Sequence, residues 1–97
     1  MKKLIFILLL IPLFSISQTA EDFFNNGTEK ANLKDYYGAI ADYTKVIELD
    51  PDYARAYNNR GTSKWNLGDK NGACADFRKA ISLGSTTNIE WVRNNCN

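Results

Sequence analysis

The sequence predicts an all-α fold: an α-solenoid of two helix hairpins, closed by a short C-terminal capping helix. Three observations predict it. A stretch of 34 residues occurs twice in succession, the same turn-forming residues recur in both copies, and aromatic and small residues recur at helical spacing in each copy. Helix pairs of this kind cannot bury their apolar faces alone, so they stack on one another and need a cap at the open end.

The repeat covers most of the chain. When residues 20–53 are aligned with residues 54–87, fifteen of the thirty-four pairs are identical, and two more keep an aromatic side chain. This degree of identity at one constant offset indicates two copies of the same structural unit. We therefore assign residues 18–97 to one domain, with repeat one at 20–53, repeat two at 54–87 and the capping helix at 88–97.

Each repeat is expected to form two helices. The first helix begins near Glu21, or near Arg55 in the second copy. It carries an aromatic residue one turn before a glycine, which is Gly27 or Gly61. Glycine inside a helix costs about 1 kcal/mol relative to alanine, so we expect it where another helix approaches closely. The second helix supplies a small residue for that contact, such as Ala39, which would let two antiparallel helices pack tightly.

Turn-forming residues mark the helix ends. Asp35 and Asp69 precede the second helices, where an aspartate side chain can accept hydrogen bonds from the first backbone N–H groups. Pro51 cannot continue a helix, so it ends the second helix of repeat one. Thr19, with Asp22 three residues later, predicts a capping box at the start of the domain.

The capping helix is predicted from an incomplete third unit. Trp91 lies thirty-four residues after Tyr57 and so occupies the aromatic position of that unit. Thr87, with Glu90 three residues later, predicts a capping box at the start of this helix. We expect the helix to run antiparallel to residues 70–83 and to cover repeat two.

The two cysteines allow three interpretations. Residues 1–17 are typical of an export signal and so predict an oxidising compartment, where an even cysteine count favours a disulfide between Cys74 and Cys96. An antiparallel capping helix would return its late residues towards Cys74. Such a bridge would contribute roughly 3 kcal/mol to a small domain. Two free thiols are the main alternative. A redox-active pair is disfavoured because no C-x-x-C motif is present.

The first seventeen residues are typical of a secretory signal peptide. Lys2 and Lys3 form a positive head, an apolar run follows, and small residues precede Gln18, where we expect cleavage. The alternative is a retained membrane anchor, but the apolar run is shorter than the ~20 residues of a spanning helix and contains Pro12. We therefore expect a periplasmic or secreted protein with no membrane association after cleavage.

Composition argues against several classes of function. Loss of Lys2 and Lys3 would leave ten Lys and Arg against eleven Asp and Glu, a net charge of −1, which is not the basic footprint of a nucleic-acid-binding protein. The chain has no histidine, no glycine-rich phosphate loop and no G-x-S-x-G motif. We therefore expect no enzymatic activity, no cofactor and no metal site. Asp42 and Asp76 recur at the same place in each repeat, and we expect both on the solvent face.

This pattern resembles the tetratricopeptide repeat family. The residues that carry the resemblance are an aromatic, a glycine, an alanine, a second aromatic and a residue near the end of each unit. They are Phe23, Gly27, Ala39, Tyr43 and Pro51 in repeat one, and Tyr57, Gly61, Ala73, Phe77 and Ala80 in repeat two. The chain departs from the family where Lys30 and Lys64 replace a common tyrosine, and where Ser85 replaces the proline that ends the unit.

The resemblance implies a concave groove, lined by the first helices of successive repeats, that holds a peptide or a segment of another protein. Transferred position by position, the groove is lined by uncharged side chains. They are Phe24, Thr28, Ala31, Asn58, Thr62 and Trp65, with Asn25 and Asn59 near its edge. The alternative is that Trp65 packs against its neighbours and Phe24 covers the exposed first end of the stack.

The leading functional hypothesis is an exported protein–protein interaction module from a bacterium, which binds a segment of an envelope or secreted partner through this groove. A second hypothesis is a structural subunit that packs on a larger assembly or on itself, with Phe23 and Phe24 as the exposed apolar start. A third, a thiol-redox protein, would require Cys74 and Cys96 to cycle between oxidation states.

Overall fold

The computed structural model describes residues 18–97, and the predicted signal peptide lies outside the described residues. Within residues 18–97 the chain forms five α-helices and no strand. The helices are α2 (Ala20–Asn32), α3 (Tyr36–Leu49), α4 (Ala54–Asn66), α5 (Lys70–Ser82) and α6 (Ile89–Asn95).

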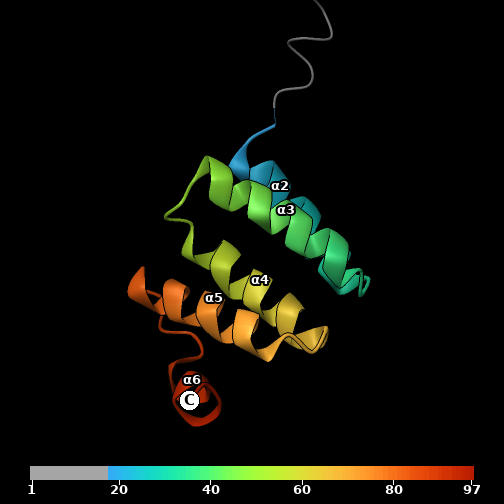
Figure 1. Cartoon of the computed structure of the whole chain (residues 1–97). Coiled ribbons are helices and arrows are strands. Elements are labelled where there is room, and N and C mark those ends of the chain that lie inside the picture. Colours follow the sequence, from blue (N-terminus) through green and yellow to red (C-terminus); the bar gives the residue numbers. More distant parts are fainter. Residues whose placement is uncertain (1–17) are drawn as a thin grey trace, which may run out of the picture.

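The helices stack in chain order (Figure 1). α2 packs against α3 and α4 against α5, and the two hairpins meet where α3 packs on α4. α6 lies against α5 at the end of the stack away from α2. The predicted solenoid of two hairpins with a short C-terminal helix is therefore confirmed. Of the helices formed by residues 18–97, none has the length and apolar character needed to cross a bilayer.

The predicted caps of the hairpin helices are present. Thr19 Oγ1 accepts a hydrogen bond from the Asp22 N–H at 3.2 Å, and the Asp22 carboxylate accepts one from the Thr19 N–H at 3.1 Å. Asp35 and Asp69 each accept a bond from the N–H of the glycine three residues later, at 3.0 and 2.9 Å. Local sequence therefore determines where α2, α3 and α5 begin.

The capping helix differs from its predicted arrangement. Figure 1 views α6 nearly end-on while α5 runs across the picture, so the predicted antiparallel packing is wrong. The predicted capping box at Thr87 is also wrong. Asn88 is the N-cap, with a left-handed φ of 68°, and Glu90 pairs with Arg93 at 2.6 Å instead. The loop at residues 83–88 lies beside α4, where Asn88 bonds to Asn58, and α6 then crosses α5.

In each hairpin, a glycine of the first helix packs against an aromatic ring of the second helix. A Cβ atom on Gly27 would lie 2.9 Å from Cε1 of Tyr43, and one on Gly61 would lie 2.9 Å from Cε1 of Phe77. The glycines therefore make room for the rings, which corrects the prediction that their main contact is with a small residue. Tyr43 is 1% exposed and lies at the centre of the core.

The repeated aspartates are not on the solvent face, so that prediction is wrong. Asp76 is buried, and Arg60 binds both of its carboxylate oxygens, at 2.9 and 2.8 Å. Lys64 Nζ lies 3.0 Å from the same carboxylate. The hydrogen bonds between Arg60 and the Asp76 carboxylate raise the pKa of Arg60 above its ordinary value. Arg60 also donates to Thr44 Oγ1 at 3.2 Å and so connects α4 to the preceding hairpin.

Repeat one contains a simpler form of this ion pair. Lys30 Nζ lies 2.8 Å from Asp42, at the positions that Lys64 and Asp76 occupy in repeat two. The hydrogen bond to Asp42 raises the pKa of Lys30. Asn26 stands at the position of Arg60, so this pair has no second cation. The lysines that depart from the family pattern are thus the partners of the repeated aspartates.

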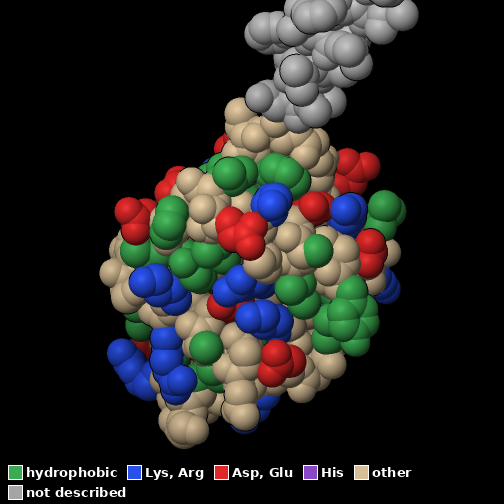
Figure 2. Space-filling view, turned by 45° about the horizontal axis from the view of Figure 1, so that its top comes forward, with side chains coloured by type: hydrophobic (Ala, Val, Ile, Leu, Met, Phe, Trp, Pro, Cys, Tyr) green, Lys and Arg blue, Asp and Glu red, His purple; other side chains and the backbone are tan. Residues whose placement is uncertain are grey.

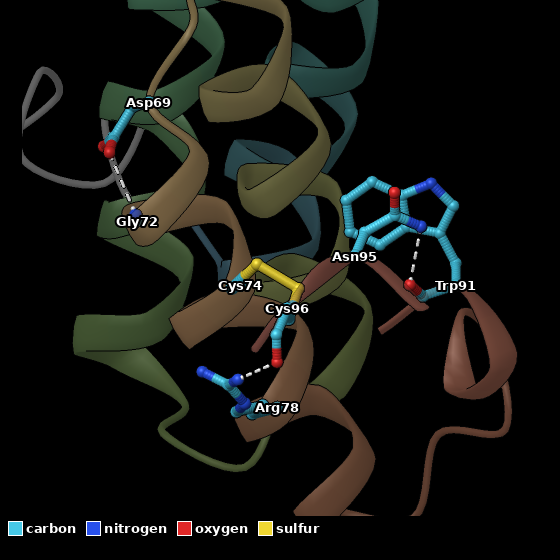
Figure 3. The surroundings of a disulfide bond; sticks show 7 residues. All are labelled: Asp69, Gly72, Cys74, Arg78, Trp91, Asn95 and Cys96. Carbon is cyan, nitrogen blue, oxygen red and sulfur yellow. Dashed lines mark hydrogen bonds between the residues drawn. A yellow bond between two sulfur atoms is a disulfide. The ribbon is translucent and has the colours of Figure 1, made fainter. Parts of the chain in front are cut away.

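A pair of cysteines joins the end of α6 to the first half of α5 (Figure 3). The sulfur atoms of Cys74 and Cys96 lie 2.04 Å apart, the distance of a disulfide, and both residues are buried. The Arg78 guanidinium donates a hydrogen bond to the Cys96 carbonyl oxygen, and Asn95 Nδ2 donates to the Trp91 carbonyl oxygen at 2.8 Å. The bridge and the Arg78 contact hold the last turn of the cap against the second hairpin, while the Asn95 bond lies within α6.

Replacement of Asp76 by Asn should lower the free energy of unfolding by about 3 kcal/mol, because it leaves two partly buried cations without a carboxylate. The matched substitution Asp42→Asn should cost clearly less, since the Lys30 side chain is 44% exposed and its charge is solvated without a partner. Urea unfolding followed by circular dichroism measures both values. Equal costs at the two positions would contradict the assigned role of burial.

Replacement of Lys34 by Gly should stabilise the protein by about 1 kcal/mol. Lys34 has a left-handed φ of 65° in the turn where repeat two has Gly68, with a φ of 85°. The side chain of Lys34 makes this conformation unfavourable, whereas glycine adopts it readily. The control is Gly68→Ala, which should destabilise the protein by a similar amount. A Lys34→Gly variant with an unchanged urea midpoint would contradict this prediction.

Reduction of the Cys74–Cys96 bridge should lower the free energy of unfolding by roughly 3 kcal/mol, because it frees the chain between the two residues in the unfolded state. Thermal unfolding with and without a reductant measures the effect. The double variant Cys74→Ala/Cys96→Ala is the control and should not respond to reductant. Titration of two thiols in the folded, unreduced protein would show that the bridge is absent.

Candidate functional site

A hollow of about 280 Å³ lies between α2 and α4, and we call it the α2–α4 groove. Its walls come from α2, α3 and α4, and all of its side chains are uncharged. The lining residues are Thr28, Ala31, Asn32, Tyr36, Tyr43, Asn59, Thr62, Ser63 and Asn66. The structure therefore brings together Thr28, Ala31, Asn59 and Thr62 of the predicted groove residues.

The groove differs from the outer surface in its lack of charge. On the face shown in Figure 2, Lys and Arg side chains are interspersed with Asp and Glu. In the groove, hydroxyl and amide groups take their place. Thr28 Oγ1 lies 2.9 Å from Tyr43 Oη, and Asn66 Nδ2 donates to the Thr62 carbonyl oxygen at 2.9 Å. The side-chain amides of Asn32 and Asn59 have no hydrogen-bond partner among residues 18–97, so both are available to a ligand.

A second hollow, of about 190 Å³, lies between α4 and α6, and we call it the cap pocket. It is lined by three aromatic rings and two polar side chains. They are Trp65, Phe77, Trp91, Thr62 and Asn88. The ring of Trp65 meets that of Trp91 edge to face, with centroids 4.8 Å apart, and Phe77 lies 5.2 Å from Trp91. Thr62 lines both hollows, so the cap pocket is the neighbour of the groove.

The predicted groove residue Trp65 belongs to the cap pocket. It packs against Trp91, as the alternative interpretation required, yet it remains 41% exposed. The packing and the exposure are compatible because Trp91 contacts Trp65 edge to face and leaves part of the indole uncovered.

Phe24 was predicted to line the groove, and this is wrong. It is 7% exposed and lies in the core, where its ring is 5.6 Å from Tyr43 and 5.2 Å from Tyr53. The Arg55 guanidinium covers it at 4.7 Å from the ring centroid. Tyr53 and Arg55, at the start of α4, therefore cover the Phe24 ring and keep it from contacting a ligand in the groove.

Asn58 also lies outside the α2–α4 groove. Its side chain accepts a hydrogen bond from Asn88 Nδ2 at 2.8 Å, and it lines a separate hollow beside the loop at residues 83–87. The loop that leads to α6 thus takes the surface that this residue was expected to offer to a ligand.

Sequence reasoning missed several lining residues. Asn32 and Asn66 are an identical pair in the repeat alignment, which was a usable signal for a shared role. The position of Asn88 in the lining of the cap pocket had no such signal in the sequence, because it depends on the path of the loop before α6. Among residues 18–97 no three His, Cys, Asp or Glu side chains gather in a way that could hold a metal ion.

Two family models match the chain. One, described as TPR repeat, matches residues 29–68, and the other, described as tetratricopeptide repeat, matches residues 54–84. No curated protein matches the chain significantly. The two family matches together span more than half of the chain and include the whole of α3, α4 and α5. The chain therefore belongs to the tetratricopeptide repeat family.

Proposed function

We propose that this protein is an exported interaction module that holds an extended segment of another protein in the α2–α4 groove. The observation that carries the proposal is the lining of the groove, which contains no charge and combines hydroxyl groups with two side-chain amides that have no partner in the described part of the chain. Tetratricopeptide repeats are generally protein–protein interaction modules and typically not enzymes, which supports binding as the activity.

An extended peptide suits this lining chemically. Its backbone displays both N–H donors and C=O acceptors, and each side-chain amide of Asn32 and Asn59 offers one group of each kind. Both hollows are smaller than the roughly 300 Å³ at which small-molecule sites usually begin. A chain that lies along the surface and contacts successive shallow hollows fits them better than a compact ligand.

The compartment of the partner follows from the first seventeen residues. Their positive head and apolar run support export, and a buried cysteine pair at disulfide distance is compatible with an oxidising compartment. The proposed partner is therefore a segment of an envelope or secreted protein, with no nucleic acid and no membrane involved after the leader is removed.

The alternative of a structural subunit has less support. That hypothesis was based on the expectation that Phe23 and Phe24 are exposed at the N-terminal end of the stack. Phe24 is instead buried in the core, and Phe23 packs against the same cluster. The groove remains the better candidate because two of its three side-chain amides, those of Asn32 and Asn59, have no partner within residues 18–97.

A substitution at Thr62 tests the groove directly. Peptides selected on the wild-type protein from a phage-displayed random library should lose about tenfold or more in affinity for Thr62→Arg, which places a long cation between the two hollows. Thr62 is exposed and its hydroxyl donates to the Asn58 carbonyl within its own helix, so the fold should persist.

The matched control is Ala41→Arg, which adds the same side chain at an exposed position of α3 that lines neither hollow. Selected peptides should bind this variant as they bind the wild type. Equal binding to both variants would show that the peptides bind elsewhere and would refute the proposed site.

A further inference from the structure

We propose that the cap pocket receives one bulky, uncharged apolar side chain of the bound segment, and that the Cys74–Cys96 bridge keeps this pocket formed. The inference rests on the proposed function, because it extends the same peptide from the α2–α4 groove towards α6. It adds a specificity site and a dependence on oxidation state, neither of which follows from the groove alone.

The cap pocket is the repeat-two counterpart of the α2–α4 groove. Thr28, Ala31 and Tyr43 line the groove, and the residues thirty-four positions later line the pocket. Those residues are Thr62, Trp65 and Phe77. An extended segment that follows the first helices along the stack therefore meets the same positions twice.

The lining side chains of the cap pocket differ in chemistry from those of the α2–α4 groove. Alanine is replaced by tryptophan and the tyrosine hydroxyl is lost, while Trp91 of α6 supplies the opposite wall. Polar groups that can bond a peptide backbone thus give way to three aromatic rings. Burial of an aliphatic or aromatic side chain against such rings is favourable, because apolar area is removed from water on both sides.

Aromatic rings also attract cations, so the charge around the pocket decides between the two classes of side chain. No carboxylate lines the pocket. The nearby Asp76 carboxylate is already bound by Arg60 and Lys64, and Glu90 is paired with Arg93. A lysine or arginine of the ligand would find no free counter-charge there, so an uncharged side chain is the better occupant.

The pocket depends on the attachment of α6. This helix has seven residues, too few to be stable alone. It is held by the Cys74–Cys96 bridge, by the contact of Arg78 with the Cys96 carbonyl and by the packing of Trp91 on Phe77. Loss of the covalent link lets the end of the cap fray, and the pocket then loses its Trp91 wall.

The two tryptophans allow a direct test. They are the only tryptophans in the chain and both line the pocket, so their indole N–H signals in a ¹H–¹⁵N spectrum report its occupancy. Titration with N-acetyl-leucinamide should shift both signals in a saturable way, with a dissociation constant in the millimolar range. N-acetyl-lysinamide should bind about tenfold more weakly or not at all.

Variants assign the effect to the pocket and to the bridge. Trp65→Ala should abolish the shift of the Trp91 signal, whereas Tyr37→Ala, which removes an exposed aromatic of α3 that does not line the pocket, should leave both shifts unchanged. Cys74→Ser/Cys96→Ser should weaken binding of the leucine derivative about tenfold. Trp91→Ala removes the same wall while the bridge stays intact, and it should weaken binding equally even if the serine variant folds poorly.

Three results would overturn the inference. They are the absence of any indole shift in the oxidised wild-type protein, equal shifts with the lysine derivative, and undiminished binding in both the serine and the Trp91→Ala variants. Failure here together with selected peptides that still lose affinity for Thr62→Arg would reject the cap pocket but keep the groove. Leucine-derivative binding that persists when no selected peptide distinguishes Thr62→Arg would support the pocket as a site for an isolated side chain and reject a bound segment that spans both hollows.

Discussion

The contact between a glycine and an aromatic ring determines how close the two helices of each hairpin lie, and the surfaces used for binding depend on it. Because Gly27 carries no side chain, Tyr43 can cross beneath α2 and bring its hydroxyl to Thr28 on the concave side. Gly61 admits Phe77 in the same way, and that ring forms part of the cap pocket. The same glycine–aromatic contact thus contributes a wall to both hollows. That wall carries a hydroxyl group where the ring is Tyr43 and is apolar where the ring is Phe77.

Much of the fold could be predicted from the sequence, because a repeat with caps constrains local structure strongly. The starts of α2, α3 and α5 depend on Thr19, Asp35 and Asp69, whose side chains act on backbone groups only a few residues away. The path of the chain after α5 could not be predicted, since it depends on a left-handed residue at Asn88 and on contacts with α4.

The site could be predicted in part. Thr28 and Thr62 face the groove because their position in the repeat determines which side of the first helix they occupy. Phe24 and Asn58 have equivalent positions in the two repeats, but different neighbours cover them: the segment before α4 covers one and the loop before α6 covers the other. Burial of Asp76 also could not be predicted from the sequence, because Arg60 and Lys64 come into contact with it only when α4 packs against α5.

The core is shared between the hairpins in a way that affects how the molecule unfolds. Phe24, Tyr43 and Val46 of the first hairpin form one cluster with Ala56 of the second, and Arg60 reaches back to Thr44. In long repeat arrays each unit contributes its own stability plus a term for its neighbour, so that the ends can melt separately. Between the two hairpins lies a single boundary, and it carries both apolar and polar contacts. When the second hairpin opens, the first therefore loses Ala56 from its core cluster and the Arg60 hydrogen bond to Thr44, so its stability depends on its neighbour.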